Sequence, residues 1–117
     1  MLPKQPRVAH AHAALAAAVR AHLDAHPEKR IPLPELETIF HVSGTQIKSA
    51  YRDAFGVSLY ADTKRRKMLA AADALRHTSR TVLEIACSLG YDNASKFAAA
   101  FRSIYGVSPT EYRAGDQ

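Results

Sequence analysis

Apolar and polar residues follow one another with the period of an α-helix along most of the chain. In the clearest segment the apolar residues stand at i, i+3, i+4, i+7 and i+8, namely Ile47, Ala50, Tyr51, Ala54 and Phe55. Ser43 followed by Gln46 is a capping-box pattern, which starts a helix, and Gly56 is typical of a helix end. The pattern predicts a three-turn helix with one buried face.

Two longer helices are predicted on either side of this segment. The first runs from about residue 7 to residue 26, and its apolar line consists of Leu15, Ala18, Val19, Ala21 and Leu23. The second runs from about residue 58 to residue 77, with an inward face of Met68, Leu69, Ala72 and Leu75. A short helix opens at Pro34 and contains Leu36, Ile39 and Phe40.

Local signals delimit three more helices in the C-terminal part. Thr81 with Glu84 is a second capping box, and Gly90 ends the short helix that it starts. A helix over residues 93–105 stops at Gly106, and a last helical turn begins with a third box, Ser108, Pro109 and Glu111. The chain has 22 alanines and no tryptophan, which favours helices over strands. We expect an all-α fold of about seven helices.

Composition and charge narrow the class of protein. A length of 117 residues suits one domain, and no apolar run approaches the roughly 18 residues of a membrane span. A single cysteine, Cys87, cannot form an internal disulfide, so we expect a soluble protein of the cytoplasm. The net charge of +5 suits a polyanionic partner. Residues 1–6, with two prolines, are interpreted as a tail or linker stub, which favours a fragment of a longer protein.

The chain contains an internal repeat of about 50 residues. One copy consists of Ile47, Ala50, Tyr51, Arg52, Phe55, Gly56, Val57 and Ser58, and the other of Phe97, Ala100, Phe101, Arg102, Tyr105, Gly106, Val107 and Ser108. Upstream the match continues one residue out of step, so the turn in the second copy is one residue longer. It pairs Glu35, Leu36, Phe40 and Val42 with Glu84, Ile85, Leu89 and Tyr91. Each unit is therefore a short helix, a tight turn and a second helix.

The repeat alone leaves two interpretations open, a helical hairpin duplicated for packing and a pair of DNA-reading units. The polar face of the second helix favours DNA, because it carries hydroxyl and basic groups near its start, namely Thr45, Lys48, Ser49 and Arg52. The helix starts near Ser43 and Asn93 also direct backbone N–H groups toward phosphates. A helix of about 20 residues spans roughly 30 Å, close to one turn of B-DNA, so one chain suffices for two adjacent major-groove segments.

These residues resemble the AraC/XylS type of bacterial transcriptional regulator. The resemblance covers residues 8–113 and is strongest over Ile85-Ala86-Cys87-Ser88-Leu89-Gly90-Tyr91, Phe97, Phe101-Arg102, Tyr105-Gly106-Val107-Ser108-Pro109 and Tyr112-Arg113. It implies a seven-helix DNA-binding domain over residues 7–113, with helix-turn-helix subdomains at about 34–56 and 81–106, a linker helix at 58–77 and a tail at 114–117. It also implies sequence-specific binding of double-stranded DNA, with RNA polymerase as a further partner and dimerisation through an N-terminal domain absent from this chain.

Candidate DNA-binding residues follow from the polar faces and from the resemblance together. In the first unit they are Ser43, Thr45, Gln46, Lys48, Ser49 and Arg52. In the second unit they are Asn93, Ala94, Ser95, Lys96, Ala99 and Arg102. Alanine side chains offer no hydrogen bond, so we expect them to contact thymine methyl groups, or else the second helix contacts chiefly the DNA backbone. We therefore expect stronger base reading in the first unit. We expect the domain alone to bind as a monomer.

Two positions depart from the family pattern. Glu37 stands where that pattern usually has alanine, and His41 stands where it usually has glycine. Both lie near the crossing of the two helices of the first unit. We therefore expect any departure from the family geometry at the angle between those two helices.

Other chemistry in the chain supports two rival functions. His10 with His12 and His22 with His26 are metal-ligand types at helical spacing, which allows a metal-responsive or protein-interaction module built on the first helix. Cys87 with a nearby histidine allows an enzyme, although no partner for a thiolate is visible. The basic run at residues 64–67 is typical of a solvated face. We expect no catalytic site, cofactor or metal.

Overall fold

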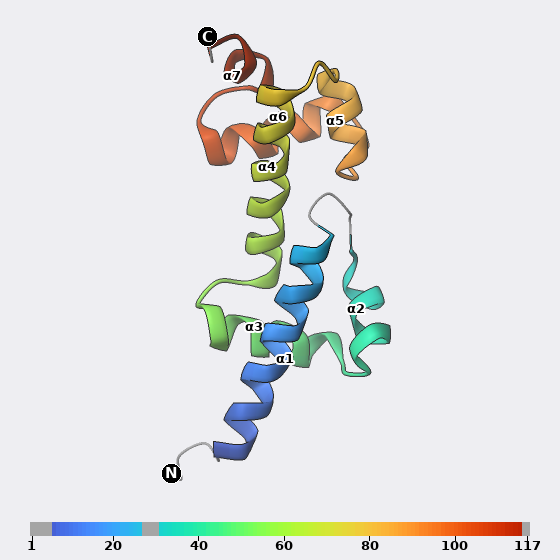
Figure 1. Cartoon of the computed structure of the whole chain (residues 1–117), viewed down its shortest axis with the longest axis vertical. Helices are drawn as coiled ribbons and strands as arrows, with labels where there is room; N and C mark the ends of the chain where they lie inside the picture. The colour runs from blue at the N-terminus through green and yellow to red at the C-terminus, as the bar shows by residue number, and fades with distance from the viewer. Residues whose placement is uncertain (1–5, 27–30, 116–117) are drawn as a thin grey trace. The chain divides into compact units, whose positions relative to one another are not determined.

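The computed structural model describes residues 6–26 and 31–115, in which all regular structure is α-helical. Their helices are α1 (Pro6–Ala25), α2 (Leu33–Phe40), α3 (Gly44–Phe55), α4 (Leu59–His77), α5 (Val82–Ser88), α6 (Ala94–Tyr105) and α7 (Pro109–Gly115) (Figure 1). The expected all-α class with seven helices is confirmed. Except for Pro6, the tail predicted at residues 1–6 lies outside the described residues, as does the side chain of His10.

All three capping boxes are present. The side-chain oxygens of Ser43, Thr81 and Ser108 accept from the backbone N–H groups of Gln46, Glu84 and Glu111 at 3.1, 3.0 and 3.1 Å. The side chains of those three partners accept from the cap residues' own N–H groups in return. Because each box satisfies two backbone donors that a helix start leaves unpaired, the starts of α3, α5 and α7 are determined locally.

Both copies of the repeat end in the same way. Gly56 and Gly106 have φ angles of 73° and 79°, in the left-handed region that favours glycine. Their N–H groups donate to the carbonyl oxygens of Arg52 and Arg102 at 2.9 and 2.8 Å. The two helices α3 and α6 are thus closed by equivalent turns, as the repeat predicts.

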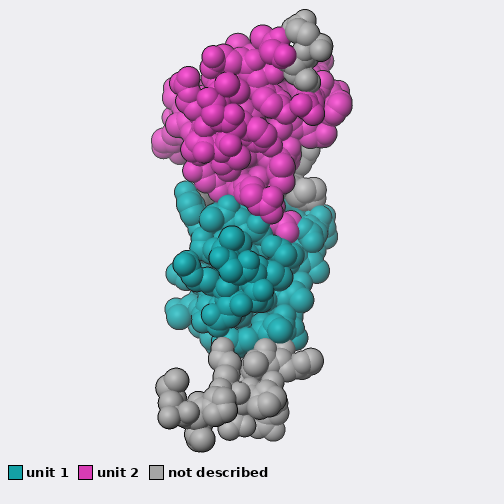
Figure 2. Space-filling model, turned by 90° about the vertical axis from the view of Figure 1, so that its left-hand side faces the viewer, with its two compact units in different colours: residues 1–26, 31–62 teal, residues 27–30, 63–117 magenta. Residues whose placement is uncertain are grey.

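The contacts divide the chain into two units, and the division falls within α4 after Asp62 (Figure 2). The first unit contains α1, α2, α3 and the start of α4. In it α1 packs on α3 (Figure 1). Its core consists of Val19, Leu23, Leu36, Ile47, Tyr51 and Leu59, with Leu15, Phe40 and Phe55 packed against it. Because Ile47 and Tyr51 fill this core, the polar side of α3 is left facing outward.

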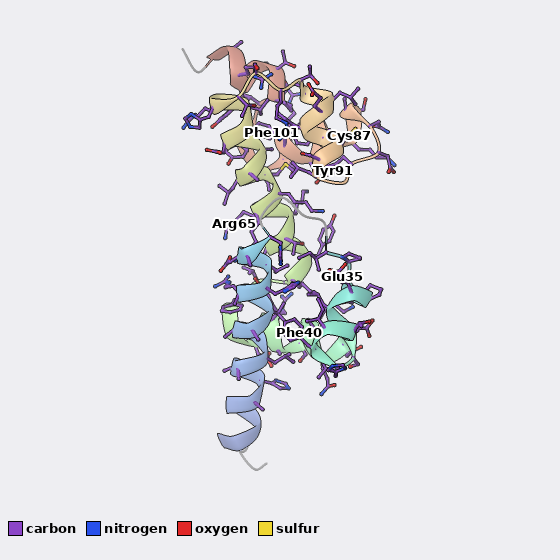
Figure 3. All side chains as sticks on the ribbon, turned by 45° about the vertical axis from the view of Figure 1, so that its right-hand side comes forward. Glu35, Phe40, Arg65, Cys87, Tyr91 and Phe101 are labelled. Atoms are coloured by element: carbon purple, nitrogen blue, oxygen red, sulfur yellow. The ribbon has the colours of Figure 1, made fainter. Side chains whose placement is uncertain are left out.

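The second unit contains the rest of α4 together with α5, α6 and α7. Its core is formed by Met68, Ala71, Ala72, Ala74, Leu75, Ile85, Ala86, Leu89, Phe97 and Phe101. The rings of Phe101, Tyr105 and Tyr112 pack together: the Phe101 centroid lies 4.6 and 5.3 Å from those of Tyr105 and Tyr112, which are 5.4 Å from each other. Phe97 and Phe101 are fully buried as predicted, and Tyr91 is half-buried against this core (Figure 3).

Several residues predicted to be inward-facing are exposed. Ala18 and Ala21 are exposed, and the buried line of α1 passes through Ala16, Val19 and Leu23 instead. Ala54 of α3 is exposed as well. On α4 the inward face is Met68, Ala71, Ala72 and Leu75, so Leu69 points about 100° away from Met68 and is 49% exposed. The alanine predictions were wrong because so small a side chain is compatible with either face of a helix.

Candidate nucleic-acid interface

The outer face of α3 carries four exposed polar residues on a rigid support. Ile47, Ala50 and Tyr51 are fully buried on the opposite side, which fixes the rotation of the helix. Within the described part of the chain no hydrogen bond or ion pair involves the exposed side chains, which are Thr45, Lys48, Ser49 and Arg52. The structure therefore brings together two hydroxyls and two cations that are free to bind an external partner.

The other two candidates of the first unit, Ser43 and Gln46, belong to the capping box. The Ser43 hydroxyl oxygen accepts from the Gln46 N–H, and the Gln46 side-chain oxygen accepts from the Ser43 N–H at 3.4 Å. Both residues are exposed. The amide nitrogen of Gln46 keeps its two donors, so a role for Gln46 in contacting a ligand is compatible with its role in the cap.

Of the two residues that depart from the family pattern, Glu37 lies in α2 and His41 lies in the turn between α2 and α3. His41 has a φ angle of 56° and is the only non-glycine residue with positive φ among those described. Its N–H donates to the carbonyl oxygen of Glu37 at 2.8 Å. The Glu37 carboxylate in turn accepts from the Gly44 N–H at 2.7 Å. Glu37 thus connects α2 to the first residue of α3.

The outer face of α6 is less polar than that of α3. Ser95 and Ala99 are exposed and Ala94 is half-buried. Asn93 caps the helix by accepting from the Lys96 N–H at 2.8 Å. The Lys96 ammonium lies 3.4 Å from the Asp92 carboxylate, in an exposed ion pair. Only Ser95 offers a polar side chain without a partner among these residues of the described structure.

Arg102 differs from its repeat counterpart Arg52 because it has a carboxylate neighbour. Its guanidinium lies 3.8 Å from Glu111, and both side chains are exposed. The position equivalent to Glu111 in the first unit is Ala61, so no such pair forms there. Arg102, a candidate DNA-binding residue, is therefore paired with a carboxylate in this structure. Such an exposed pair is weak enough to exchange for a phosphate.

A family model described as a helix-turn-helix domain matches residues 36–115, which is more than half of the chain. The matched region holds both helix pairs, α2 with α3 and α5 with α6. Its two-unit organisation is that of the AraC type. The chain belongs to the AraC-type helix-turn-helix family. It is a DNA-binding protein of transcriptional regulation.

Individual AraC-type relatives and structures agree with this assignment. The uncharacterized HTH-type transcriptional regulator YfiF of Bacillus subtilis is 28% identical over 111 residues, which are 95% of this chain and 35% of YfiF. The C-terminal domain of AraT, a response regulator from Geobacillus stearothermophilus, superposes with a TM-score of 0.80 at 26% identity, covering 88% of this chain and 86% of that domain.

A structure with DNA shares the same fold. The DNA-binding domain of AdpA, a global transcriptional factor crystallised with a target DNA, superposes with a TM-score of 0.77 at 23% identity and covers 86% of this chain and 90% of that domain. The chain spans 30–39% of the length of the first four curated relatives that it matches.

The residues behind the rival functions lie on α1, just after it and on α5, not on the candidate faces of α3 and α6. No three His, Cys, Asp or Glu residues cluster to hold a metal ion in the part of the chain that the structure describes. The His22 and His26 rings contact each other edge-on, with centroids 4.9 Å apart. Cys87 is exposed on α5, next to the buried residues Ile85 and Ala86 (Figure 3). None of the described helices has the length and apolar character needed to cross a bilayer.

A buried polar cluster, missed in the sequence, joins the elements of the first unit. The Tyr51 hydroxyl donates to the carboxylate of Asp62, which is 2% exposed, and the Arg20 guanidinium lies 3.4 Å from the same carboxylate. Burial raises the pKa of Tyr51, and its hydrogen bond to Asp62 raises that pKa further. Arg20 also lies over the Phe55 ring, 3.6 Å from its centroid. This cluster ties α1 and the start of α4 to α3.

The basic run of α4 is engaged within the second unit at Lys67. Its ammonium lies 5.7 Å from the centroid of the Tyr91 ring. Arg65, Arg66 and Lys67 all have further interactions inside the chain. Lys64, Arg66 and Lys67 are half-buried and Arg65 is exposed, so the run is only partly a solvated face.

Proposed function

We propose that α3 reads base edges in the DNA major groove and that it supplies most of the sequence specificity. The observation that carries this proposal is the exposed face formed by Thr45, Lys48 and Ser49, which has no partner within the described chain. Lysine is a donor suited to guanine O6 and N7, and hydroxyl groups accept from or donate to several bases. Arg52, further along α3, is placed for a phosphate.

The second reader helix, α6, is proposed to act mainly through shape and backbone contacts. Ala94 and Ala99 suit contact with thymine methyl groups, and Ser95 supplies one hydrogen-bonding side chain. Lys96 and Arg102 are assigned to phosphates, for which they exchange their exposed pairs with Asp92 and Glu111. Asn93 is assigned to positioning, since its side chain caps the helix.

Both reader helices belong to one chain, so we propose that the domain binds as a monomer to a site of about 20 base pairs, with α3 and α6 in successive major-groove segments. The helix-turn-helix subdomains are assigned to residues 34–56 and 81–106 within a domain of residues 7–113. RNA polymerase at a promoter in the bacterial cytoplasm is the proposed protein partner. Dimerisation, where it occurs, is assigned to regions such as those that the longer relatives carry.

Selection of bound duplexes from a random library, followed by footprinting of the selected site, tests the monomer proposal. We expect a protected site of about 20 base pairs without twofold symmetry, occupied by one chain. A palindrome that is filled only by two chains would contradict it.

The assignment of Lys48 and Ser49 is tested on the selected duplex and on a scrambled duplex of equal composition. Lys48→Ala and Ser49→Ala should each weaken binding to the selected duplex by about 1–3 kcal/mol if a bidentate contact is lost, with a smaller effect on the scrambled one. Lys64→Ala on α4 is the control for loss of one positive charge. Equal losses on both duplexes would assign Lys48 and Ser49 to phosphates instead.

A further inference from the structure

Glu37 makes hydrogen bonds on both sides of the turn that joins α2 to α3. Its backbone carbonyl accepts from the His41 N–H at 2.8 Å, and its carboxylate accepts from the Gly44 N–H at 2.7 Å. Gly44 is the first residue of α3 and is buried, whereas Glu37 is half-buried. The Glu37 side chain therefore links α2 directly to the N-terminus of α3, the proposed first reader helix.

The packing at Gly44 leaves little room between the two helices. A Cβ atom at this position would lie 2.7 Å from Cδ2 of Leu33 and 3.4 Å from Cδ of Glu37. The first turn of α3 thus rests directly on α2. The Gly44 N–H is directed at the carboxylate instead of at solvent, so this donor is already used before DNA arrives.

The second unit has no equivalent of this carboxylate. The repeat pairs Glu37 with Ala86, whose backbone carbonyl accepts from the N–H groups of Leu89 and Tyr91 at 3.2 and 3.0 Å. The side chain of Ala86 is a methyl group, which cannot accept a hydrogen bond from the backbone N–H groups at the start of α6. The nearest acid in that turn, Asp92, holds the side chain of Lys96 instead of a backbone N–H.

We propose that Glu37 is a positioning residue for DNA binding, an inference that rests on the proposed role of α3 as a base reader. Its hydrogen bond to Gly44 holds α3 in the orientation that aligns Lys48 and Ser49 with bases. Its negative charge lies at the end of α3 that would otherwise attract a phosphate, so DNA backbone is kept from that end. The first unit therefore depends on base contacts more than the second unit does.

Two substitutions separate the hydrogen bond from the charge. Glu37→Gln keeps an acceptor for the Gly44 N–H and removes the charge, whereas Glu37→Ala removes both. Asp73→Asn is the matched control, since it removes one negative charge from the exposed surface of α4, outside either helix pair. Affinity is measured on the selected and scrambled duplexes at two salt concentrations, and each variant is also melted thermally.

The charge effect is expected to be independent of DNA sequence. Glu37→Gln should bind both duplexes about threefold more tightly than the wild type at low salt, and the gain should shrink at higher salt because screening weakens it. Asp73→Asn should show a smaller gain. An affinity for Glu37→Gln no greater than that of Asp73→Asn would overturn the charge role.

The positioning effect is expected in the ratio of the two affinities. Glu37→Ala should reduce the preference for the selected duplex about tenfold, and Glu37→Gln should retain it. A merely structural role would lower the melting temperature of Glu37→Ala while leaving this ratio unchanged, and that result would overturn the proposal. Lys48→Ala is measured in parallel. If it loses preference while Glu37→Ala does not, this inference alone fails; if Lys48→Ala also keeps full preference, the proposed base reader fails with it.

Discussion

Two positions of the repeat carry different side chains in the two units, and the contact between these two positions differs in kind from one core to the other. Tyr51 is equivalent to Phe101, and Asp62 is equivalent to Tyr112. In the first unit the Tyr51 hydroxyl donates to the Asp62 carboxylate. In the second unit the Phe101 ring packs edge-on against the Tyr112 ring. A hydrogen-bonded polar pair in one copy is thus replaced by an aromatic pair in the other.

Tyr51→Phe should destabilise the protein by about 1–3 kcal/mol, because the buried Asp62 carboxylate loses its hydroxyl donor while remaining out of water. Urea unfolding followed by circular dichroism measures this change. Tyr60→Phe is the control, since that side chain is 77% exposed and its loss of a hydroxyl should change stability by no more than about 0.5 kcal/mol. Equal unfolding midpoints for the two variants would argue against a structural role for the cluster.

Periodicity predicts which face of a helix is buried, but it does not predict which polar residue is buried with it. Asp62 stands among polar residues near the start of α4, and only its alignment with Tyr112 in the repeat distinguishes it. Arg20 gives no such signal, because α1 lies outside the repeat. The exposed positions Lys48, Ser49 and Ser95 were predictable, since each lies on the polar side of an unambiguous stripe. Which bases these side chains contact depends also on the DNA sequence of the bound site, which the protein sequence does not specify.

At the scale of the element, helix ends were the most predictable features of this fold. A capping box and a left-handed glycine involve residues within four positions of one another, so their signals are complete in a short sequence window. The turn at His41 was not predictable in the same way. Its backbone adopts a conformation that glycine usually supplies, and the compensating bond runs from Gly44 to Glu37, seven residues apart.

The box at the start of α5 predicts a pH dependence. Hydrogen bonds from the Thr81 backbone N–H and side chain lower the pKa of Glu84 below its ordinary value of 4.5. Because the folded-state pKa is depressed, this stabilisation is complete above pH 4.5 and is lost as the pH falls through the folded-state pKa. Glu84→Gln should therefore melt below the wild type at pH 7, and the difference should shrink as the pH falls below 4.5 through the folded-state pKa of Glu84. A difference that stays constant with pH would show that the charge of Glu84 contributes nothing.

The crossing of α5 with its neighbours is expected to tolerate no larger side chain at Ala86, which is fully buried. Ala86→Leu should overpack the second core and cost about 1–3 kcal/mol of stability. Ser95→Ala, on the exposed face of α6, should leave the melting temperature nearly unchanged and weaken DNA binding if that face contacts DNA. Normal affinity in both Ser95→Ala and Lys96→Ala would exclude this face of α6 as a reader.

At the scale of the whole molecule, the two units have cores with no residue in common. Each could be predicted as a compact helix-turn-helix unit, because the repeat presents the same stripe and the same stop twice.

Separate cores predict separate responses to mutation. Ala86→Leu should reduce amide hydrogen-exchange protection in α5 and α6 while leaving that of α3 within about twofold of the wild type. Tyr51→Phe should give the reverse pattern. Exchange measured by mass spectrometry on peptides from both units tests this expectation. Equal loss of protection in both units for either variant would show that they unfold as one cooperative body.

The exposed thiol of Cys87 allows a dye to be attached to one copy of the repeat at a time. It is the chain's only cysteine and lies on the outer part of α5, outside the buried core. Its repeat counterpart is Thr38, which is likewise exposed on α2. A dye attached at Cys87, or at position 38 in the variant Thr38→Cys with Cys87→Ser, would sit on the first helix of one pair at a time. Fluorescence from the two labelled proteins would then time the docking of each unit on DNA, so that the order in which one chain engages its two groove segments becomes directly observable.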